Sequence, residues 1–295
     1  MTRVTQVHCQ ASLVEDEDQF RIYAGTNFDI VVPKNTGPEI KFDVNDWGIV
    51  KLKLNYISEY ESPTSYLSSL SQLTGKGYAF DNINWYRYGL SEASRTYVNG
   101  SRTQLDRNAS IDFSVVIFND NTTIEEFSIT ALQTTYLEMR ISNWSYTEDV
   151  EGLALNIQSF MEGDTAEYKR LGPYVDSENT ELSAFKIWHE TTNFIFHFQK
   201  LIKIIMEDNS EELVLSNSFQ TYNPSVTDNK PVDFWISIPY IENVKQIIFR
   251  FVCNFGVQEH TTTSLSLSFY WVITFFVLLN IPFIFLIKKR RRVRN

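Results

Sequence analysis

Histidine paired with serine or cysteine carries most nucleophilic catalysis, and no spacing in this chain indicates such a pair. The four histidines are His8, His189, His197 and His260. His8 adjoins Cys9, but neighbours on a strand point to opposite faces, so adjacency alone does not join a base to a nucleophile. His189 lacks the second histidine one helical turn later that a zinc protease requires. The sequence therefore favours a protein that is not an enzyme.

Paired carboxylates could hydrolyse a glycosidic bond if both acids faced one substrate. The candidates by residue type are Asp16 with Glu17, Glu125 with Glu126, and Asp149 with Glu151. We expect adjacent acids on a strand to point to opposite faces, and the spaced pair to lie in a turn. An ectoenzyme that acts on glycans is therefore the least favoured of three hypotheses for the function.

Clustered oxygen atoms are what a hard cation such as Ca²⁺ needs. Four oxygen-rich segments could supply them, at residues 14–20, 43–46, 119–121 and 147–152. Solvated acidic turns would show the same composition, so calcium binding and plain turns both stay open. No other cofactor is indicated.

The segment NWYRYGL (84–90) is the best candidate contact surface. Aromatic side chains and arginine dominate binding surfaces, which singles out Trp85, Tyr86, Arg87 and Tyr88. On a strand, Trp85 and Arg87 would share one face, and Tyr86 and Tyr88 the other. One of these faces is expected to pack in the core, so at most half of the segment is free for a partner.

Four glycosylation sequons and one cysteine pair fit an extracellular or lumenal location. The sequons begin at Asn99, Asn108, Asn121 and Asn143, although chance alone would yield about four in a chain of this composition. Cys9 and Cys253 are the only cysteines. They form either one disulfide or two buried thiols, and the sequence does not decide between these.

The elements that must position these residues are mostly strands, because alternation of apolar and polar residues dominates the chain. Alternating or apolar runs predict strands at 51–57, 113–118, 136–141, 153–157, 194–198, 212–216, 234–238 and 246–253. Helical patterns are scarce, with candidates at 201–208 and 161–171. The predicted fold class is mainly β, an antiparallel β-sandwich-like domain followed by one C-terminal transmembrane helix.

Residues 1–264 could form one large β-rich domain or two tandem ones. Strand-turn-Trp patterns at 40–47 and 137–144 are 97 residues apart, close to the length of one β-sandwich domain. If the similarity of the two patterns reflects a duplication, the two domains would meet near 125–135. An accidental match is the simpler interpretation.

The C-terminal end has the composition of a membrane anchor. No charged residue occurs from Leu265 to Ile287, and 23 such residues would span roughly 34 Å as a helix. Six of the eight residues in 288–295 are basic. Because Lys and Arg beside a span stay in the cytoplasm, we expect 288–295 inside and 1–264 outside or in a lumen.

Asn280 and Pro282 interrupt the predicted span. Proline frees backbone groups and asparagine can hydrogen-bond a second helix, so this pair could mark contact with another membrane subunit. A lone kinked span is the simpler interpretation. The first twenty residues contain no apolar run typical of a signal peptide, so a type I topology implies a signal outside this sequence or removed from it. A tail-anchored protein facing the cytosol is the alternative.

Charge excludes nucleic acid as a partner. With 20 basic and 36 acidic residues, residues 1–287 carry a net charge of −16, which repels phosphate backbones. The leading hypothesis is a single-pass membrane glycoprotein whose β-rich ectodomain binds a protein or glycan on the outer side, as an adhesion or receptor module. An accessory subunit of a membrane protein complex is the second hypothesis. The predicted location is the plasma membrane or the endomembrane system.

Overall fold

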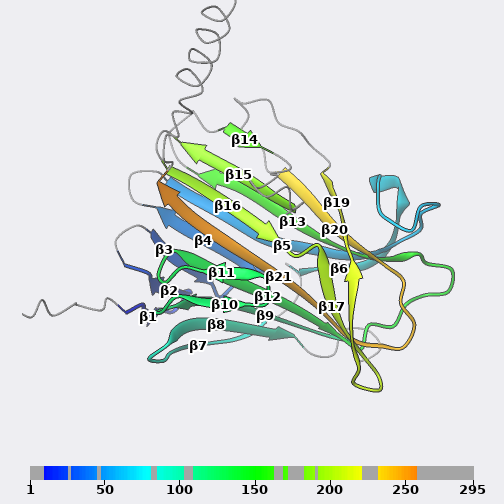
Figure 1. Ribbon diagram of the computed structural model, residues 1–295, viewed down its shortest axis with the longest axis horizontal. Helices are drawn as coiled ribbons and strands as arrows, with labels where there is room; N and C mark the ends of the chain where they lie inside the picture. The colour runs from blue at the N-terminus through cyan, green and yellow to red at the C-terminus, as the bar shows by residue number, and fades with distance from the viewer. Residues whose placement is uncertain are drawn as a thin grey trace, which may run out of the picture. The chain divides into compact units, whose positions relative to one another are not determined.

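The computed structural model describes residues 10–25, 28–44, 48–80, 85–102, 109–162, 169–171, 183–189, 192–220 and 232–257 (Figure 1). Within these ranges the chain is mainly antiparallel β-structure, which confirms the predicted class. The 3-10 turn η1, Leu70–Gln72, is capped at its N-terminus by a capping box of Ser69 and Gln72.

Nine strands form the first sheet, in the order β1-β2-β3-β4-β5-β13-β20-β19, with β6 also paired to β5. Their bounds are β1 Ser12–Glu15, β2 Gln19–Tyr23, β3 Phe28–Pro33, β4 Glu39–Val44, β5 Gly48–Tyr60, β6 Leu73–Ala79, β13 Gly152–Glu162, β19 Asn217–Gln220 and β20 Val232–Pro239.

Ten strands form the second sheet, in the order β14-β15-β16-β21-β12-β9-β8-β7, with β17 paired to β21 and β18 paired to β17. Their bounds are β7 Tyr86–Ser91, β8 Arg95–Arg102, β9 Ser110–Phe118, β12 Thr134–Ser142, β14 Lys169–Leu171, β15 Ser183–His189, β16 Thr192–Phe198, β17 Leu201–Met206, β18 Glu211–Leu215 and β21 Val244–Val257. A separate hairpin joins β10 Thr122–Ile124 to β11 Phe127–Ile129.

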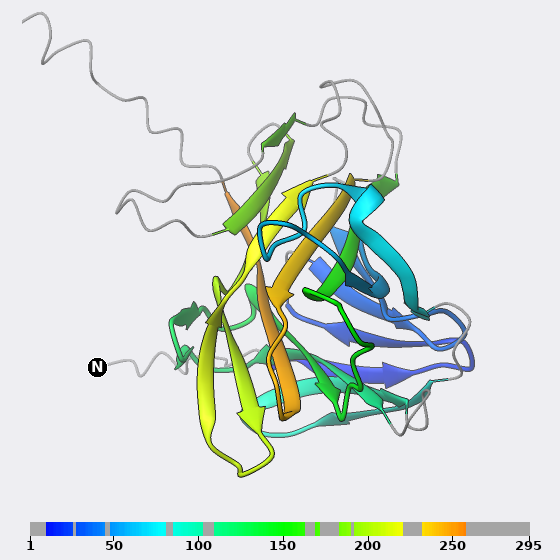
Figure 2. The ribbon, with the colours of Figure 1, turned by 90° about the vertical axis from the view of Figure 1, so that its right-hand side faces the viewer.

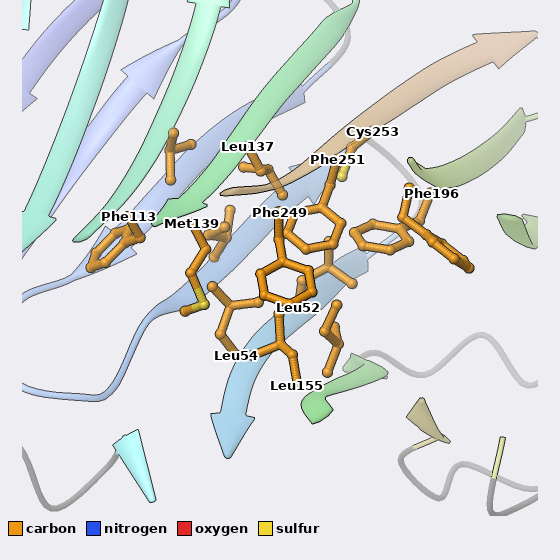
Figure 3. Close-up of a cluster of buried hydrophobic side chains, with 14 of the residues drawn as sticks. Leu52, Leu54, Phe113, Leu137, Met139, Leu155, Phe196, Phe249, Phe251 and Cys253 are labelled. Atoms are coloured by element: carbon orange, nitrogen blue, oxygen red, sulfur yellow. The ribbon is translucent and has the colours of Figure 1, made fainter. Parts of the chain in front are cut away.

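The two sheets share one apolar core, to which strands of both sheets contribute alternate side chains. Phe28 of β3 stacks on Phe255 of β21 with ring centroids 4.4 Å apart, and Phe198 of β16 meets Phe234 of β20 at 4.8 Å. Figure 3 shows the middle of this core, where Leu52 and Leu155 of the first sheet face Phe249 of the second. This packing gives each sheet one inner face. Two smaller apolar clusters lie apart from this core, and one of them joins the β10–β11 hairpin to the second sheet.

The described strands do not divide at 125–135. β9 and β12, which flank that segment, pair with each other over eight residue pairs, and β5 pairs with β13 across it. Residues 1–257 form one compact unit. The two strand-turn-Trp patterns also fall in different sheets, on β4 and β12, so they do not mark two equivalent halves.

The helix expected at 201–208 is wrong, because this segment forms strand β17 and the turn that follows it. Ile202 and Ile204 point into the core, whereas Leu201 and Ile205 lie on the outward side. Outward apolar residues mask the alternation and imitate a helical period. Within 161–171, where one short helix was considered, residues 161–162 belong to β13 and 169–171 to β14. Residues 163–168 lie outside the described part, so the short helix stays a prediction.

A transmembrane helix is not among the described elements: none of them is a helix long and apolar enough for a bilayer. Residues 265–287, on which the anchor prediction depends, lie outside the described ranges. The membrane anchor therefore remains a prediction from the sequence.

Candidate contact surface

The exposed aromatic residues of the segment 84–90 lie on one face of an edge strand. β7 pairs only with β8 among the described strands, and it ends the ten-stranded sheet. Tyr86, Tyr88 and Leu90 alternate along it and are 69%, 45% and 47% exposed. Across β8, the register places Asn99 opposite Tyr88 and Tyr97 opposite Leu90. We call these five residues the tyrosine strip.

The opposite side of the same segment is structural. Trp85 packs edge-on against Phe80 and Phe113, with ring centroids 5.9 and 5.4 Å away, and its indole Nε1 donates to the Phe80 carbonyl at 3.1 Å. A Cβ at Gly89 would lie 2.6 Å from Leu13 Cδ2, so a side chain at this position would require Leu13 to move. Trp85 is therefore a packing residue and not a free contact residue.

Arg87 also points inward, and it fastens β7 to the loop between β3 and β4. Its guanidinium donates to the carbonyls of Lys34, Thr36 and Gly37. Burial lowers the pKa of Arg87 to about 10, which still leaves it charged at neutral pH. The Arg87 guanidinium thus holds two parts of the fold together and is not available to a partner. The predicted contact residues are therefore divided between the two faces: Trp85 and Arg87 on the inner one, Tyr86 and Tyr88 on the outer one.

Hydrogen bonds and ring contacts hold the tyrosine strip in one arrangement. The Asn99 amide Nδ2 donates to the Tyr88 hydroxyl at 2.9 Å, and the Ser114 hydroxyl donates to Asn99 Oδ1 at 2.5 Å. The Tyr88 ring lies 6.2 Å from Tyr86 and 6.4 Å, edge-on, from Tyr97. A pre-arranged aromatic surface loses little side-chain entropy when a partner covers it.

A buried ion-pair network lies beside the tyrosine strip on the same outer face. The register continues from Asn99 to Ser114 of β9 and then to Glu138 of β12 and Arg250 of β21. Arg250 donates from Nε to Glu138 Oε2 at 2.9 Å and from a terminal nitrogen to Glu125 Oε2 at 2.6 Å. The Arg250 and Glu138 side chains are only 8% and 10% exposed.

Two further donors complete this network. The Arg140 Nε donates to Glu138 Oε1 at 2.5 Å, and the Tyr136 hydroxyl donates to Glu138 Oε2 at 2.7 Å. Burial opposes ionisation of Glu138, but the hydrogen bonds from Tyr136 and the two arginines outweigh burial and lower its pKa. Glu138 is thus held as a carboxylate, which is the wrong state for a general acid.

The acidic pair Glu125 and Glu126 does not lie on a strand, contrary to the expectation from the sequence. Both residues form the tight turn between β10 and β11, and Glu125 has a φ of 52°. Their carboxylates therefore converge, each accepting from Gln199 Nε2 at 2.9 Å, rather than pointing to opposite faces. Since Arg250 and Gln199 engage them, these acids fasten the hairpin to the sheet.

The remaining acidic candidates lie in turns. Asp16 and Glu17 join β1 to β2, and Asp149, with a φ of 65°, precedes Glu151 in the loop before β13. Among the residues that the structure describes, no group of three or more histidine, cysteine or acidic side chains could hold a metal ion. Residues 45–46 of the segment 43–46 lie outside that description.

The other predicted site residues are dispersed. Asn121 and Asn143 are exposed, whereas Asn99 is half-buried and hydrogen-bonded within the sheet. Cys253 has a free thiol whose pKa burial raises, and His197 lies on the side of β16 opposite Phe196 and Phe198. The predicted residues that fall outside the described parts are His8, Cys9, Asn108, His260, Asn280 and Pro282; of His189 only the backbone is described.

Sequence reasoning missed the Arg250 network. Its one visible signal was the run YLEMRI (136–141), in which Tyr136, Glu138 and Arg140 alternate with the apolar residues that face the core. From the sequence alone, alternate polar residues on a strand indicate only a solvent-exposed face. Only the register shows that Arg250 lies opposite Glu138 and that a hairpin covers them both.

No family model matches this chain, and no curated protein has a similar sequence. Several solved structures superpose on it at low identity. A galactose 1-epimerase from Lactobacillus acidophilus is 8% identical, with a TM-score of 0.45, over 85% of this chain and 99% of that one. A heparinase III is 11% identical, with a TM-score of 0.46, over 85% of this chain and 37% of that one.

A heparan sulfate lyase from Pedobacter heparinus is 10% identical, with a TM-score of 0.42, over 85% of this chain and 37% of that one. Similarity at this level does not assign a family, a substrate or a site. The function must therefore be inferred from the chain's own residues.

Proposed function

We propose that this protein is a membrane-anchored binding module whose β-sandwich contacts a protein or glycan partner on the outer side through the tyrosine strip. The observation that carries the proposal is the pair Tyr86 and Tyr88, which are 69% and 45% exposed on the same side of an edge strand. Large aromatic side chains left in water at a fixed geometry are typical of binding surfaces.

The composition of the strip suits recognition more than solubility. Tyrosine offers a broad apolar ring and a polar hydroxyl, and it loses few rotamers when buried by a partner. Asn99 and Ser114 add hydrogen-bonding groups to the same face, while Arg87 and Trp85 hold the strand from beneath. The platform is therefore rigid, whereas its surface is chemically mixed.

The ion-pair network supports a binding role over catalysis. The charged groups beside the strip bind one another: Glu138 contacts Arg140, Arg250 and Tyr136, and Glu125 contacts Arg250 and Gln199. A hydrolase would need one acid free to donate a proton to substrate. These carboxylates are instead engaged in holding β10, β11, β12 and β21 together.

Membrane attachment rests on the sequence of the C-terminal end. In the proposal, residues 265–287 cross the bilayer and residues 288–295 lie in the cytoplasm, so the strip faces outward. Service as an accessory subunit, docked through Asn280 and Pro282, remains the second hypothesis. It differs in requiring a partner within the membrane.

A paired substitution tests the contact surface. The full chain, in nanodiscs and fluorescently labelled, is applied to a glycan microarray and to intact cells of the source organism. We expect Tyr86→Ser with Tyr88→Ser to weaken binding at least 30-fold, since a hot-spot tyrosine contributes about 2 kcal/mol or more. The thermal midpoint should stay within about 2 °C, because both rings are exposed.

Tyr23→Ser is the matched control, because Tyr23 is 41% exposed on the other sheet. It should leave binding unchanged. Binding on the array identifies a glycan partner, and binding to cells alone a protein partner. Equal binding by the double variant and the wild type would refute the proposed surface, as would equal loss in the Tyr23 variant.

A further inference from the structure

The hairpin of β17 and β18 exposes a second apolar surface, separate from the tyrosine strip. Leu201, Leu213 and Leu215 are 44%, 62% and 44% exposed. The register places Leu201 opposite Leu215 and Lys203 opposite Leu213, so these side chains share one outward face. We call the three leucines the leucine face. Figure 2 shows the hairpin in yellow-green, projecting at the lower left.

Ile202 and Ile204 of the same hairpin are fully buried, so the hairpin is anchored in the core. An ion pair of 2.6 Å between Lys203 Nζ and Glu211 Oε2 joins its two strands. The leucines are therefore exposed on a stable strand pair. Contiguous exposed leucines on a rigid element mark an interaction surface more often than a solvated one.

β18 is also an edge strand. Within the described part of the chain it pairs only with β17, so its outer backbone N–H and C=O groups face no strand there. An exposed, apolar edge is a template for a further strand. The strand sequence EELVL, in which Leu213 and Leu215 lie on one side, offers both backbone pairing and side-chain contact to such a strand.

We propose that β18 pairs antiparallel with β18 of a second copy of this chain, about a two-fold axis at Val214. In this register Leu213 of each copy lies opposite Leu215 of the other. Glu211 and Glu212 then lie beyond the end of the partner's β18, which stops at Leu215, so no two acids face each other. The strand is thus complementary to itself, as an isologous dimer requires.

The neighbouring registers are worse. An axis at Leu213 would place Glu211 opposite Leu215, and an axis at Glu212 would place two glutamates directly opposite. An axis at Leu215 would leave Leu213 and Val214 beyond the end of the partner's β18. Like charges across a strand pair are destabilising, as is a carboxylate set against a leucine. Moving the axis by one residue shifts the pairing by two residues, which keeps each side chain on its face of the sheet. These registers are therefore the relevant alternatives. The Val214 axis is therefore the one that the sequence of β18 favours.

Cysteine cross-linking tests both the dimer and its register. In a Cys9→Ser background, full-length Leu213→Cys and Leu215→Cys chains carrying different tags are co-expressed and oxidised in native membranes. Opposed residues in antiparallel strands have Cα atoms about 4.5–5.5 Å apart, within disulfide reach. We expect disulfide-linked heterodimers of the two tags at least five-fold above the homodimers formed by either chain alone.

Leu201→Cys is the matched control, because Leu201 is as exposed as Leu215 and on the same face but lies on the inner strand β17. It should not cross-link to itself. Heterodimers no more abundant than homodimers would overturn the Val214 register, and cross-linking of Leu201→Cys at the same level would show collision rather than pairing. Leu213→Lys, which changes only an exposed side chain, should convert the detergent-solubilised dimer to monomer in light scattering. A wild-type chain that is monomeric there would also refute the proposal.

Discussion

Glu59→Ala is expected to lower the thermal unfolding midpoint of the sandwich by about 6–12 °C, the equivalent of roughly 3 kcal/mol for a domain of this size. Glu59 of β5 is completely buried. Its Oε1 accepts from Trp144 Nε1 at 3.1 Å and from the Thr147 backbone N–H at 3.2 Å, and its Oε2 accepts from the Thr147 hydroxyl.

Alanine would leave the buried Trp144 indole and two donors of the half-buried Thr147 without their acceptor, and a cavity beside them. Each unsatisfied buried donor costs about 1–3 kcal/mol, although removal of a buried charge offsets part of this. Trp144 lies within the contact, so tryptophan fluorescence during heating reports the transition.

Glu59→Gln is the control for this prediction. The amide oxygen can still accept from Trp144 and Thr147, and the Thr147 hydroxyl can rotate to accept from the amide nitrogen. We expect the midpoint of this variant to stay within about 3 °C of the wild type, since one rearranged hydrogen bond contributes about 1 kcal/mol. Equal losses for alanine and glutamine would show that the charge, and not the acceptor geometry, holds the loop.

Arg250→Ala should be comparably damaging, with an expected loss of about 3–5 kcal/mol in the free energy of unfolding. The arginine is shared by Glu138 and Glu125, and its side chain is 8% exposed. Removal leaves the nearly buried Glu138 carboxylate with one cation fewer and releases the β10–β11 hairpin through Glu125. Urea unfolding of the full chain, followed by fluorescence, measures the loss.

Arg140→Ala provides a matched comparison, because Arg140 also binds Glu138 but is 49% exposed. An exposed ion pair contributes about 0–1 kcal/mol, so this variant should unfold nearly as the wild type does. If both substitutions cost the same, burial does not set the strength of the network. The double substitution Arg250→Met with Glu138→Gln should be more stable than Arg250→Ala, because the buried carboxylate that would lack a partner is then absent.

Alternation in the sequence was sufficient to predict the fold class and many of the strands. Strands whose inward residues are apolar and whose outward residues include polar ones, such as β5 and β9, were predicted correctly. β17 was mistaken for a helix because Leu201 and Ile205 place apolar residues on its outward side as well. Leu201 also belongs to the leucine face inferred to bind a second copy, so the error has a physical cause in the exposed face.

Pairing between distant strands was beyond sequence reasoning. The alternation of NWYRYGL correctly separated Tyr86 and Tyr88 from Trp85 and Arg87, because period two is a local property. It could not show that Arg87 binds the carbonyls after β3, or that Arg250 lies opposite Glu138. Those contacts depend on the order of strands in the sheet, which no local pattern encodes.

The claim on which the proposed function depends is that the sandwich and its tyrosine strip lie outside the membrane while the basic tail lies inside. Intact cells are treated with a membrane-impermeant, lysine-reactive biotin reagent, and labelled peptides are identified by mass spectrometry. Lys245 is exposed on the sandwich, whereas Lys288 and Lys289 belong to the tail. We predict that Lys245 is labelled on intact cells and that Lys288 and Lys289 are labelled only after lysis. Labelling of Lys288 and Lys289 on intact cells, with Lys245 protected until lysis, would place the sandwich in the cytosol and contradict the proposed role.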